Sequence, residues 1–443
     1  MKDYSDWGEY LHKQHPDANL VIYGEPWAAD NDAAEELVEN PVRTGRMHMQ
    51  SEGAHVGAFN NRIRNCLKGS SDNADALGFI FDKVNNGWDG NGTDENGKAL
   101  EGNKACVFTG MIAGVRHSDA TGTDKWSAQG FSDPEQTVSY ITAHDNLALR
   151  DKIEAAGITG EEAKKLQVYA HSILMASQGI SFIHGGEEFG RTKAAAKNDT
   201  ESPIHNTYKT TTGANDFKWD LKAGDWKKVN EAYAAYIKMR KDHPAFRMTK
   251  ADQILKNVAL DKASTDSVVI INIIDGHAVK DSWDKIKVVM NSTKVEAPVD
   301  NVEGWTKVAD GYTVGDVVVQ NSSAAPQAMS IWVIPADASA QQFDSMYVHG
   351  SFTGGTWPAA EMTYSDGKWL SAEYKCESTS EFKITTNTPE WNDSQTWGKD
   401  GEKTLKIGGG NVATGCTSSF KLSVDEKTME WSLVEVASEA VIR

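Results

Sequence analysis

The sequence is short of cysteine, of basic charge and of long hydrophobic runs. It contains 4 cysteines in 443 residues, and none of them forms the C-x-x-C spacing of a metal site. Acidic residues number 63 against 45 basic ones, for a formal net charge of -18. This excess disfavours nucleic acid or an anionic membrane surface as a partner. No apolar stretch suits a membrane span, and no segment reads as a signal peptide.

Tryptophan, in contrast, is abundant, with 14 residues. An indole ring can serve as a stacking platform for the apolar face of a sugar, but large aromatics also fill protein cores, and composition leaves both roles open. Cys376 and Cys416 could pair if the protein is exported, although their separation alone does not specify a disulfide. A neutral ligand fits this composition better than a charged polymer does.

Residues 1–247 alternate helical patterns with short apolar strands, which is typical of βα units. The expected strands are NLVIYGEPW at 19–27, TVSYITAHDN at 137–146 and ISFIHGGEEFG from 180. The expected helices cover 3–16, 57–70, 159–178 and about 224–241.

From about residue 250 the pattern becomes short strands separated by turn residues. SVVIINII, IKVVMN, DVVVQN and MSIWVIPA predict an all-β domain over 248–337. ADASAQQ at 336–342 is a candidate linker, and 343–443 reads as a second β module. The predicted fold class is therefore multidomain, with a β/α part followed by two all-β sandwich domains.

Polar side chains stand at the ends of three predicted strands: Glu25, the pair His144–Asp145, and His184. In a parallel barrel the carboxyl ends of the strands open into a common mouth, so these groups are expected to lie close together. A single strand-end carboxylate is more often a cap or a surface ion pair. Three polar strand ends in one βα array favour a site.

Several ordered blocks resemble type I pullulanases, debranching enzymes of the α-amylase superfamily (glycoside hydrolase family 13). They are YGEPW, FNNRIRNCLKGS, SYITAHDNLALRDKI, SQGISFIHGGEEFGRTK and MRKDHPAFR, and the resemblance runs from about residue 8 to 335. It implies that 1–247 is the C-terminal part of a (β/α)8 barrel. It also implies catalytic roles for Glu25 as general acid/base and for His144 and Asp145 in binding the sugar and stabilising the transition state.

The same resemblance suggests substrate-binding residues: Trp27, Asn146, Asn206 and Tyr208. The sequence departs from the family pattern in HGGEEF, where Gln is more usual at the position of Glu187, and the consequence of this extra carboxylate is not readable from the sequence.

Retaining glycosidases need a second, nucleophilic carboxylate about 5 Å from the acid. In the resembling family it is an Asp in a motif like G-F-R-F-D, one strand before the Glu strand, and Met1 stands after that point. The chain is thus expected to be a partial one, inactive by itself because it lacks this Asp. GFIFD at 78–82 is similar to the motif, but Asp82 follows Glu25 and Ile80 replaces the motif's Arg, so Asp82 is rejected as nucleophile.

The module at 343–443 more weakly resembles small β-sandwich starch-binding modules, through MYVHGSFTGGTWP, EFKITTN and WNDSQTWG. Trp357, Trp391 and Trp397 are the candidate sugar platforms, and one or two of them are expected to be core residues instead.

The sequence therefore predicts a pullulanase-type glycoside hydrolase acting on α-1,6 linkages of pullulan, starch or glycogen, or alternatively a non-catalytic α-glucan-binding protein. The expected partner is an α-glucan polysaccharide, and the expected location is extracellular or the cell surface. No cofactor or metal site is predicted, and calcium binding, oligomeric state and the preferred glucan are not encoded in a readable pattern.

Overall fold

The computed structural model divides the chain into two compact units, 1–335 and 336–443. Its description covers residues 2–15, 20–25, 56–71, 74–83, 102–117, 131–193, 205, 207–209, 213–315, 322–335, 343, 345–354, 356–365, 368–376, 380–391, 395–426 and 428–435.

A four-stranded parallel sheet organises the N-terminal half of the first unit. Its strands follow sequence order: β1 (Tyr23–Gly24), β2 (Gly57–Asn60), β3 (Thr137–Tyr140) and β4 (Ile180–Phe182). All three neighbouring pairs are parallel. Because the strands are parallel, their carboxyl ends lie at one edge, where the polar residues at the ends of β1, β3 and β4 follow.

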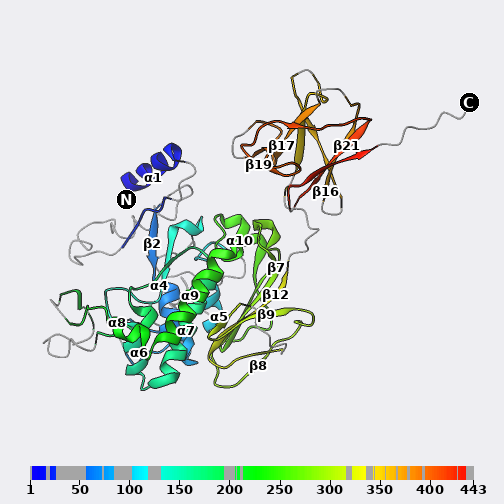
Figure 1. The fold of residues 1–443 in the computed structure, drawn as a ribbon. Helices are drawn as coiled ribbons and strands as arrows, with labels where there is room; N and C mark the ends of the chain where they lie inside the picture. The colour runs from blue at the N-terminus through cyan, green and yellow to red at the C-terminus, as the bar shows by residue number, and fades with distance from the viewer. Residues whose placement is uncertain are drawn as a thin grey trace, which may run out of the picture. The chain divides into compact units, whose positions relative to one another are not determined.

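Helices precede, connect and follow these strands (Figure 1). They are α1 (Lys2–Gln14), α4 (Asn61–Lys68), α5 (Gly102–Met111), α6 (Leu149–Ala155), α7 (Gly160–Ala176), α8 (Trp219–Ala223), α9 (Lys227–Asp242) and α10 (Ala251–Asn257). Single 3-10 turns are η1 (Phe79–Phe81), η2 (Pro134–Gln136), η3 (Glu187–Phe189), η5 (Thr207–Lys209), η6 (Pro244–Phe246) and η7 (His277–Val279).

Residues after α10 form an antiparallel sheet in the order β10-β9-β12-β7-β6-β5. Its strands are β5 (Val258–Leu260), β6 (Val268–Ile273), β7 (Trp283–Asn291), β9 (Thr306–Asp310), β10 (Thr313–Val314) and β12 (Ala328–Pro335), and β8 (Ala297–Pro298) pairs with β11 (Ser323–Ala324). The predicted strand DVVVQN falls outside the described residues.

This sheet is buried on both faces, which explains its nearly unbroken apolar strands. In β7, Val288 and Met290 pack into the same core as the helices, whereas Val289 between them belongs to a smaller cluster on the opposite face. Met329 and Trp332 of β12 are divided in the same way. Alternating side chains thus serve two different cores.

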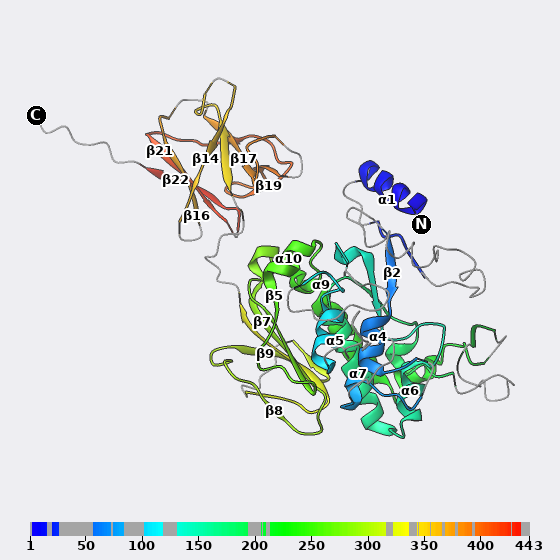
Figure 2. The same cartoon turned by 180° about the vertical axis from the view of Figure 1, so that it is seen from behind.

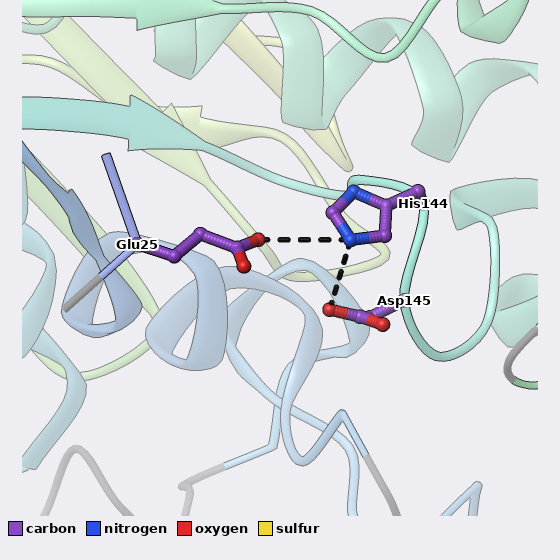
Figure 3. A group of neighbouring side chains, drawn as sticks. All are labelled: Glu25, His144 and Asp145. Carbon is purple, nitrogen blue, oxygen red and sulfur yellow. Dashed lines mark ion pairs between the residues drawn. The ribbon is translucent and has the colours of Figure 1, made fainter. Parts of the chain in front are cut away.

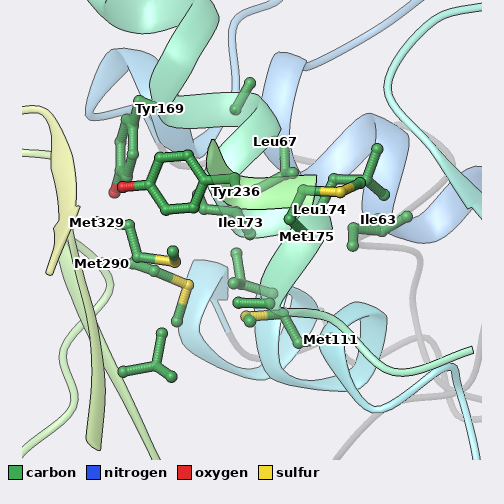
Figure 4. Packing of buried hydrophobic residues seen from close by; sticks show 14 of the residues in the cluster. Ile63, Leu67, Met111, Tyr169, Ile173, Leu174, Met175, Tyr236, Met290 and Met329 are labelled. Carbon is green, nitrogen blue, oxygen red and sulfur yellow. The ribbon is translucent and has the colours of Figure 1, made fainter. Parts of the chain in front are cut away.

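The larger core joins the helices to this sheet. Helices α7 and α9 lie side by side, and α5, α7 and α9 pack near the sheet in both views (Figures 1 and 2). In close-up, Tyr169 and Tyr236 of α7 and α9 stand beside Met290 and Met329 of the sheet (Figure 4). The compact unit therefore extends across residue 247. The division of this unit at 247 into a barrel part and an all-β domain stays a prediction.

The second unit consists of two sheets around its own core. One has the order β14-β13-β17-β18-β19 with β20 beside β17, and the other is β15-β16-β21-β22. The strands are β13 (Met346–Gly350), β14 (Ala359–Glu361), β15 (Thr363–Ser365), β16 (Lys368–Tyr374), β17 (Glu381–Thr386), β18 (Thr396–Lys399), β19 (Leu405–Ile407), β20 (Val412–Ala413), β21 (Phe420–Asp425) and β22 (Trp431–Glu435). Phe382, Leu422 and Trp431 are among the buried core residues.

All four cysteines are bonded. Cys376 and Cys416, a pair that the sequence left open, form a disulfide in the second unit, with their Cα atoms 5.7 Å apart. Cys66 of α4 and Cys106 of α5 form another, with 5.9 Å between Cα atoms. None of the described helices combines the length and apolarity that a bilayer crossing requires.

Candidate active site

Three of the predicted site residues meet at the carboxyl edge of the parallel sheet. His144 Nε2 lies 3.7 Å from Glu25 Oε1 and 3.4 Å from Asp145 Oδ2 (Figure 3). One ligand atom from each of the three residues lies within 4.8 Å of the others. About half of each side chain is exposed, so water screens these ion pairs and they contribute little stability. The group is therefore open to a ligand.

An aromatic layer, made of Tyr23, Phe59, Tyr140 and Phe182, holds these strand ends together. Each of the four strands supplies one ring, and Phe59 contacts the other three edge-on at centroid distances of 5.9, 4.9 and 5.3 Å. The layer sets the spacing between the end of β1, which carries the glutamate, and the end of β3, which carries the His–Asp pair.

Tyr140 connects this layer electrostatically to the site. Burial is the main cause of the raised pKa of its phenol; Arg64 opposes the rise, and the carboxylates of Glu25 and Asp145 add to it. The phenol accepts a hydrogen bond of 2.7 Å from Arg64. Because its pKa is raised, the Tyr140 phenol stays neutral beside the carboxylates of Glu25 and Asp145.

Tyr208 extends the site on the side of His144. Its ring meets the His144 ring edge to face at a centroid distance of 5.7 Å, and it is 52% exposed. Asn146 follows the His–Asp pair directly, in the left-handed region with φ 57°. Trp27 and Asn206, the other substrate-binding residues predicted for this part of the chain, lie outside the described residues.

His184 follows β4 and lies near the site, where His144 is among the groups that affect it. Burial is the main cause of the lowering of its pKa to about 3, and the cations Arg191 and Lys193 lower it further. Its Nδ1 is buried and has no hydrogen-bond partner among the described residues. The ring is therefore neutral at physiological pH.

Glu187 lies in η3, two residues after Gly185, and does not face solvent as an additional site carboxylate. It is buried, and it accepts hydrogen bonds from Thr142 Oγ1 at 2.6 Å and from the Tyr233 hydroxyl at 3.1 Å. Burial raises its pKa to about 7. The departure from the family pattern is thus a structural carboxyl group that joins Thr142, just after β3, to Tyr233 of α9.

Asp82 lies elsewhere in the first unit. It ends η1 and accepts a hydrogen bond of 3.2 Å from Ser292, which follows β7. Asp82 is absent from the described group of Glu25, His144 and Asp145.

Within the described part of the chain, Glu25, His144 and Asp145 form a group whose ligand atoms could hold a cation. One imidazole and two carboxylates fall short of the six to eight oxygen ligands that Ca²⁺ takes. Exposed acidic groups of this kind are common without a metal.

In the second unit the three candidate tryptophans differ in exposure. Trp391 is 51% exposed and packs against His349 at a centroid distance of 4.6 Å. Trp357 is partly buried, with φ 55°. Trp397 packs against the core, and its Nε1 donates to Thr386 at 3.3 Å. Trp391 is the one of the three that offers the most surface to a sugar.

Two features near the first site were not foreseen from the sequence. Lys193 contacts the loop of His144 and Asp145 from inside the protein. Phe217 and Trp219 stack at a centroid distance of 5.2 Å and are 43% and 60% exposed. The short polar segment that carries the two aromatics lacks the periodicity that would have drawn attention to them.

No family model matches the sequence. A pullulanase of Bacillus subtilis (strain 168) is 27% identical over 243 residues, which make up 54% of this chain and 28% of the relative. The solved pullulanase from Bacillus acidopullulyticus superposes with a TM-score of 0.57 and 28% identity, over 74% of this chain and 36% of that one.

The chain is similar to pullulanases. A solved pullulanase from Paenibacillus barengoltzii gives a TM-score of 0.55 at 25% identity, over 75% of this chain and 45% of that one. The pullulanase resemblance read from the sequence is thereby confirmed, as is a multidomain, β-rich fold. The chain spans less than a third of the curated relative and less than half of each solved neighbour.

Proposed function

We propose that the chain is the C-terminal part of a pullulanase-type debranching glycoside hydrolase that cleaves α-1,6 linkages of pullulan, starch or glycogen. The observation that carries this proposal is the meeting of Glu25, His144 and Asp145 at the carboxyl edge of a parallel sheet. In this proposal, β1 to β4 and their helices are part of a (β/α)8 barrel whose other strands lie outside these residues.

Each residue has a role that its chemistry supports. Glu25 protonates the glycosidic oxygen and later takes a proton from water. His144 donates a hydrogen bond to the sugar, and Asp145 accepts hydrogen bonds from its hydroxyls as positive charge develops on the ring. Tyr208 lies next to His144 and would contact the same sugar.

The proposed mechanism is retaining, and the proposed nucleophile is an Asp outside these 443 residues. Distance alone would allow another assignment, because oxygens of Glu25 and Asp145 lie within 4.8 Å and retaining pairs are about 5 Å apart. The family resemblance of the AHDN block favours a binding role for Asp145 instead. The two assignments differ in whether this chain alone is active.

The proposed substrate is a neutral α-glucan. The Paenibacillus barengoltzii neighbour was solved in complex with maltohexaose and α-cyclodextrin. The net charge of -18 on this chain fits a neutral polymer better than an anionic one. Two disulfides support an extracellular or cell-surface location, since such bonds persist in oxidising compartments.

A second candidate function is α-glucan binding without catalysis. The exposed ring of Trp391 on the second unit favours it, because stacking on a sugar needs no reacting group. The two functions are compatible in one protein if the second unit carries polysaccharide to the site.

The decisive experiment uses a longer protein that includes the upstream strands and measures reducing-sugar release from pullulan. Glu25→Gln should lower kcat by at least about 100-fold, because the amide keeps the shape but cannot donate the proton. Glu9→Gln is the matched control, since Glu9 lies on α1 and pairs with Lys13 at the surface. Full activity of Glu25→Gln, or equal losses in both variants, would refute the assignment.

A further inference from the structure

The loop that carries His144 and Asp145 is an irregular turn between β3 and α6. Residues 141–148 lie outside both elements, and Asn146 adopts φ 57°. A left-handed residue other than glycine persists when surrounding contacts hold it. The loop therefore needs an external support to keep Asp145 in one position.

Lys193 supplies that support from inside the protein. Its side chain is fully buried, and its Nζ donates hydrogen bonds to the His144 carbonyl at 2.8 Å and to the Asn146 carbonyl at 2.5 Å. These two carbonyls flank Asp145 on either side. One ammonium group thus holds the backbone immediately before and after the carboxylate that faces the site.

The lysine is itself anchored to the next helix. Its backbone N–H donates to Asp151 Oδ2 at 2.8 Å, and the Thr192 hydroxyl donates to Asp151 Oδ1 at 2.5 Å. Asp151 is buried in the first turn of α6. The contact therefore links the His–Asp loop, the segment after η3 and the start of α6.

We propose that Lys193 is a positioning residue whose ammonium group, bonded to the carbonyls of His144 and Asn146, fixes the orientation of Asp145 and His144 toward the ligand. The expected effect of Lys193 on turnover of a glucan rests on the proposed function. Its effect on the position of Asp145 and His144 does not.

The charge of Lys193 offers an internal test. Burial is the main cause of the lowering of its pKa to about 8. Three charged groups act on it: Asp151 on α6 and Asp145 on the loop raise the pKa of Lys193, and Arg191 on its own segment lowers it. Lys193 in turn lowers the pKa values of Lys68 on α4 and of His184. As pH rises through about 8, the ammonium loses its charge, and both hydrogen bonds to the loop carbonyls weaken because they are no longer charge-assisted.

The chain contains a matched control lysine. Lys152 is also fully buried, donates to three carbonyls, those of Ser70, Ala74 and Ala76, and has its pKa lowered to about 8 by burial. These contacts do not include the loop of residues 144–146. Lys152→Met therefore removes a comparable buried ammonium whose hydrogen bonds go to a different segment, that of Ser70, Ala74 and Ala76.

The test labels histidine in the 443-residue chain and follows the ring of His144 by NMR, with a His144→Gln spectrum for assignment. In the unaltered chain the His144 resonance and its contact with Tyr208 should change with a midpoint near pH 8. Lys193→Met should show the altered resonance already at pH 7 and no such transition. Lys152→Met should retain the transition.

A His144 ring that is unaffected by alkaline pH in the unaltered chain would overturn the proposal without any variant, even if Lys193→Met fails to fold. So would a Lys193→Met spectrum identical to the unaltered one at pH 7. In the longer protein, Lys193→Met should lower kcat on pullulan by about 10- to 100-fold with a smaller change in KM, while Lys152→Met should not. Absence of activity in every version would refute the proposed function and leave the NMR result decisive for the positioning role.

Discussion

Replacing Glu187 by Gln tests how a buried carboxyl group changes the stability of this fold with pH. Glu187 is 3% exposed, and its two oxygens accept hydrogen bonds from Thr142 and Tyr233. Glutamine has the same shape. Its oxygen can accept one of these bonds, and its amide can donate to the other hydroxyl once that hydroxyl turns. The substitution thus removes the titration while keeping the contacts.

The size and sign of the effect follow from the pKa of Glu187, which burial raises from 4.5 to about 7. Because the folded-state pKa lies above the unfolded-state value, the folded protein binds more protons between these two pH values. Stability is therefore highest below pH 4.5 and falls as pH rises toward 7. At about 1.4 kcal/mol per unit, the total loss is ~3 kcal/mol. The Glu187→Gln variant should not show this loss of stability, because glutamine does not titrate.

The assay is hydrogen exchange of peptides from α7, whose Gln167 side chain donates to the Glu187 carbonyl at 2.8 Å. The free energy of opening of the Glu187→Gln variant, relative to the unaltered chain, should be constant below pH 4.5, rise through the window and level off above pH 7 by ~3 kcal/mol. Glu162→Gln, at an exposed position in the first turn of α7, is the control. A difference that does not vary with pH would refute the reasoning.

Three further outcomes are expected. The 443-residue chain should release no reducing sugar from pullulan, because the covalent intermediate needs a nucleophile; clear turnover that Asp145→Asn abolishes would make Asp145 that nucleophile. In gel retardation with soluble starch, residues 343–443 should lose affinity on Trp391→Ala, whereas Trp397→Ala should chiefly lower thermal stability; retardation insensitive to Trp391→Ala would count against the platform. Cys376→Ser should lower the unfolding free energy of the second unit by up to about 4 kcal/mol, the chain-entropy value for a loop of 40 residues, and an unchanged denaturation midpoint would argue against the Cys376–Cys416 bond.

The sequence allowed the site residues to be found but not all of the elements that carry them. Apolar runs ending in charged residues marked the ends of β1, β3 and β4. The first run was longer than the strand it became, since only Tyr23 and Gly24 pair with β2. The sequence predicts residues 57–60 as part of a helix, which is wrong, because they form β2. A strand of four residues carries no useful periodicity, and its pairing with β1 and β3 decides its conformation.

The sequence does not predict the role of Lys193, for a different reason. Its partners are backbone carbonyls 47 and 49 residues earlier in the chain, and every residue type offers the same carbonyl. Side-chain patterns encode which faces are apolar and which positions can titrate. They do not encode which carbonyls a folded loop presents to a buried ammonium, so this contact becomes visible only in the structure.

The compositional change near residue 247 marks a change of secondary structure but not an energetic boundary. Tyr236 of α9 donates a hydrogen bond to the Gly311 carbonyl at 2.7 Å, and Met290 and Met329 of the sheet lie in the core of α7 and α9. The antiparallel sheet therefore completes the burial of the helices that hold Glu187 and, through α6 and the segment of Lys193, the loop of the candidate site. A substitution that destabilises the sheet should therefore also destabilise the elements that hold the site. This holds although none of the sheet's residues takes part in the described ion pairs of Glu25, His144 and Asp145.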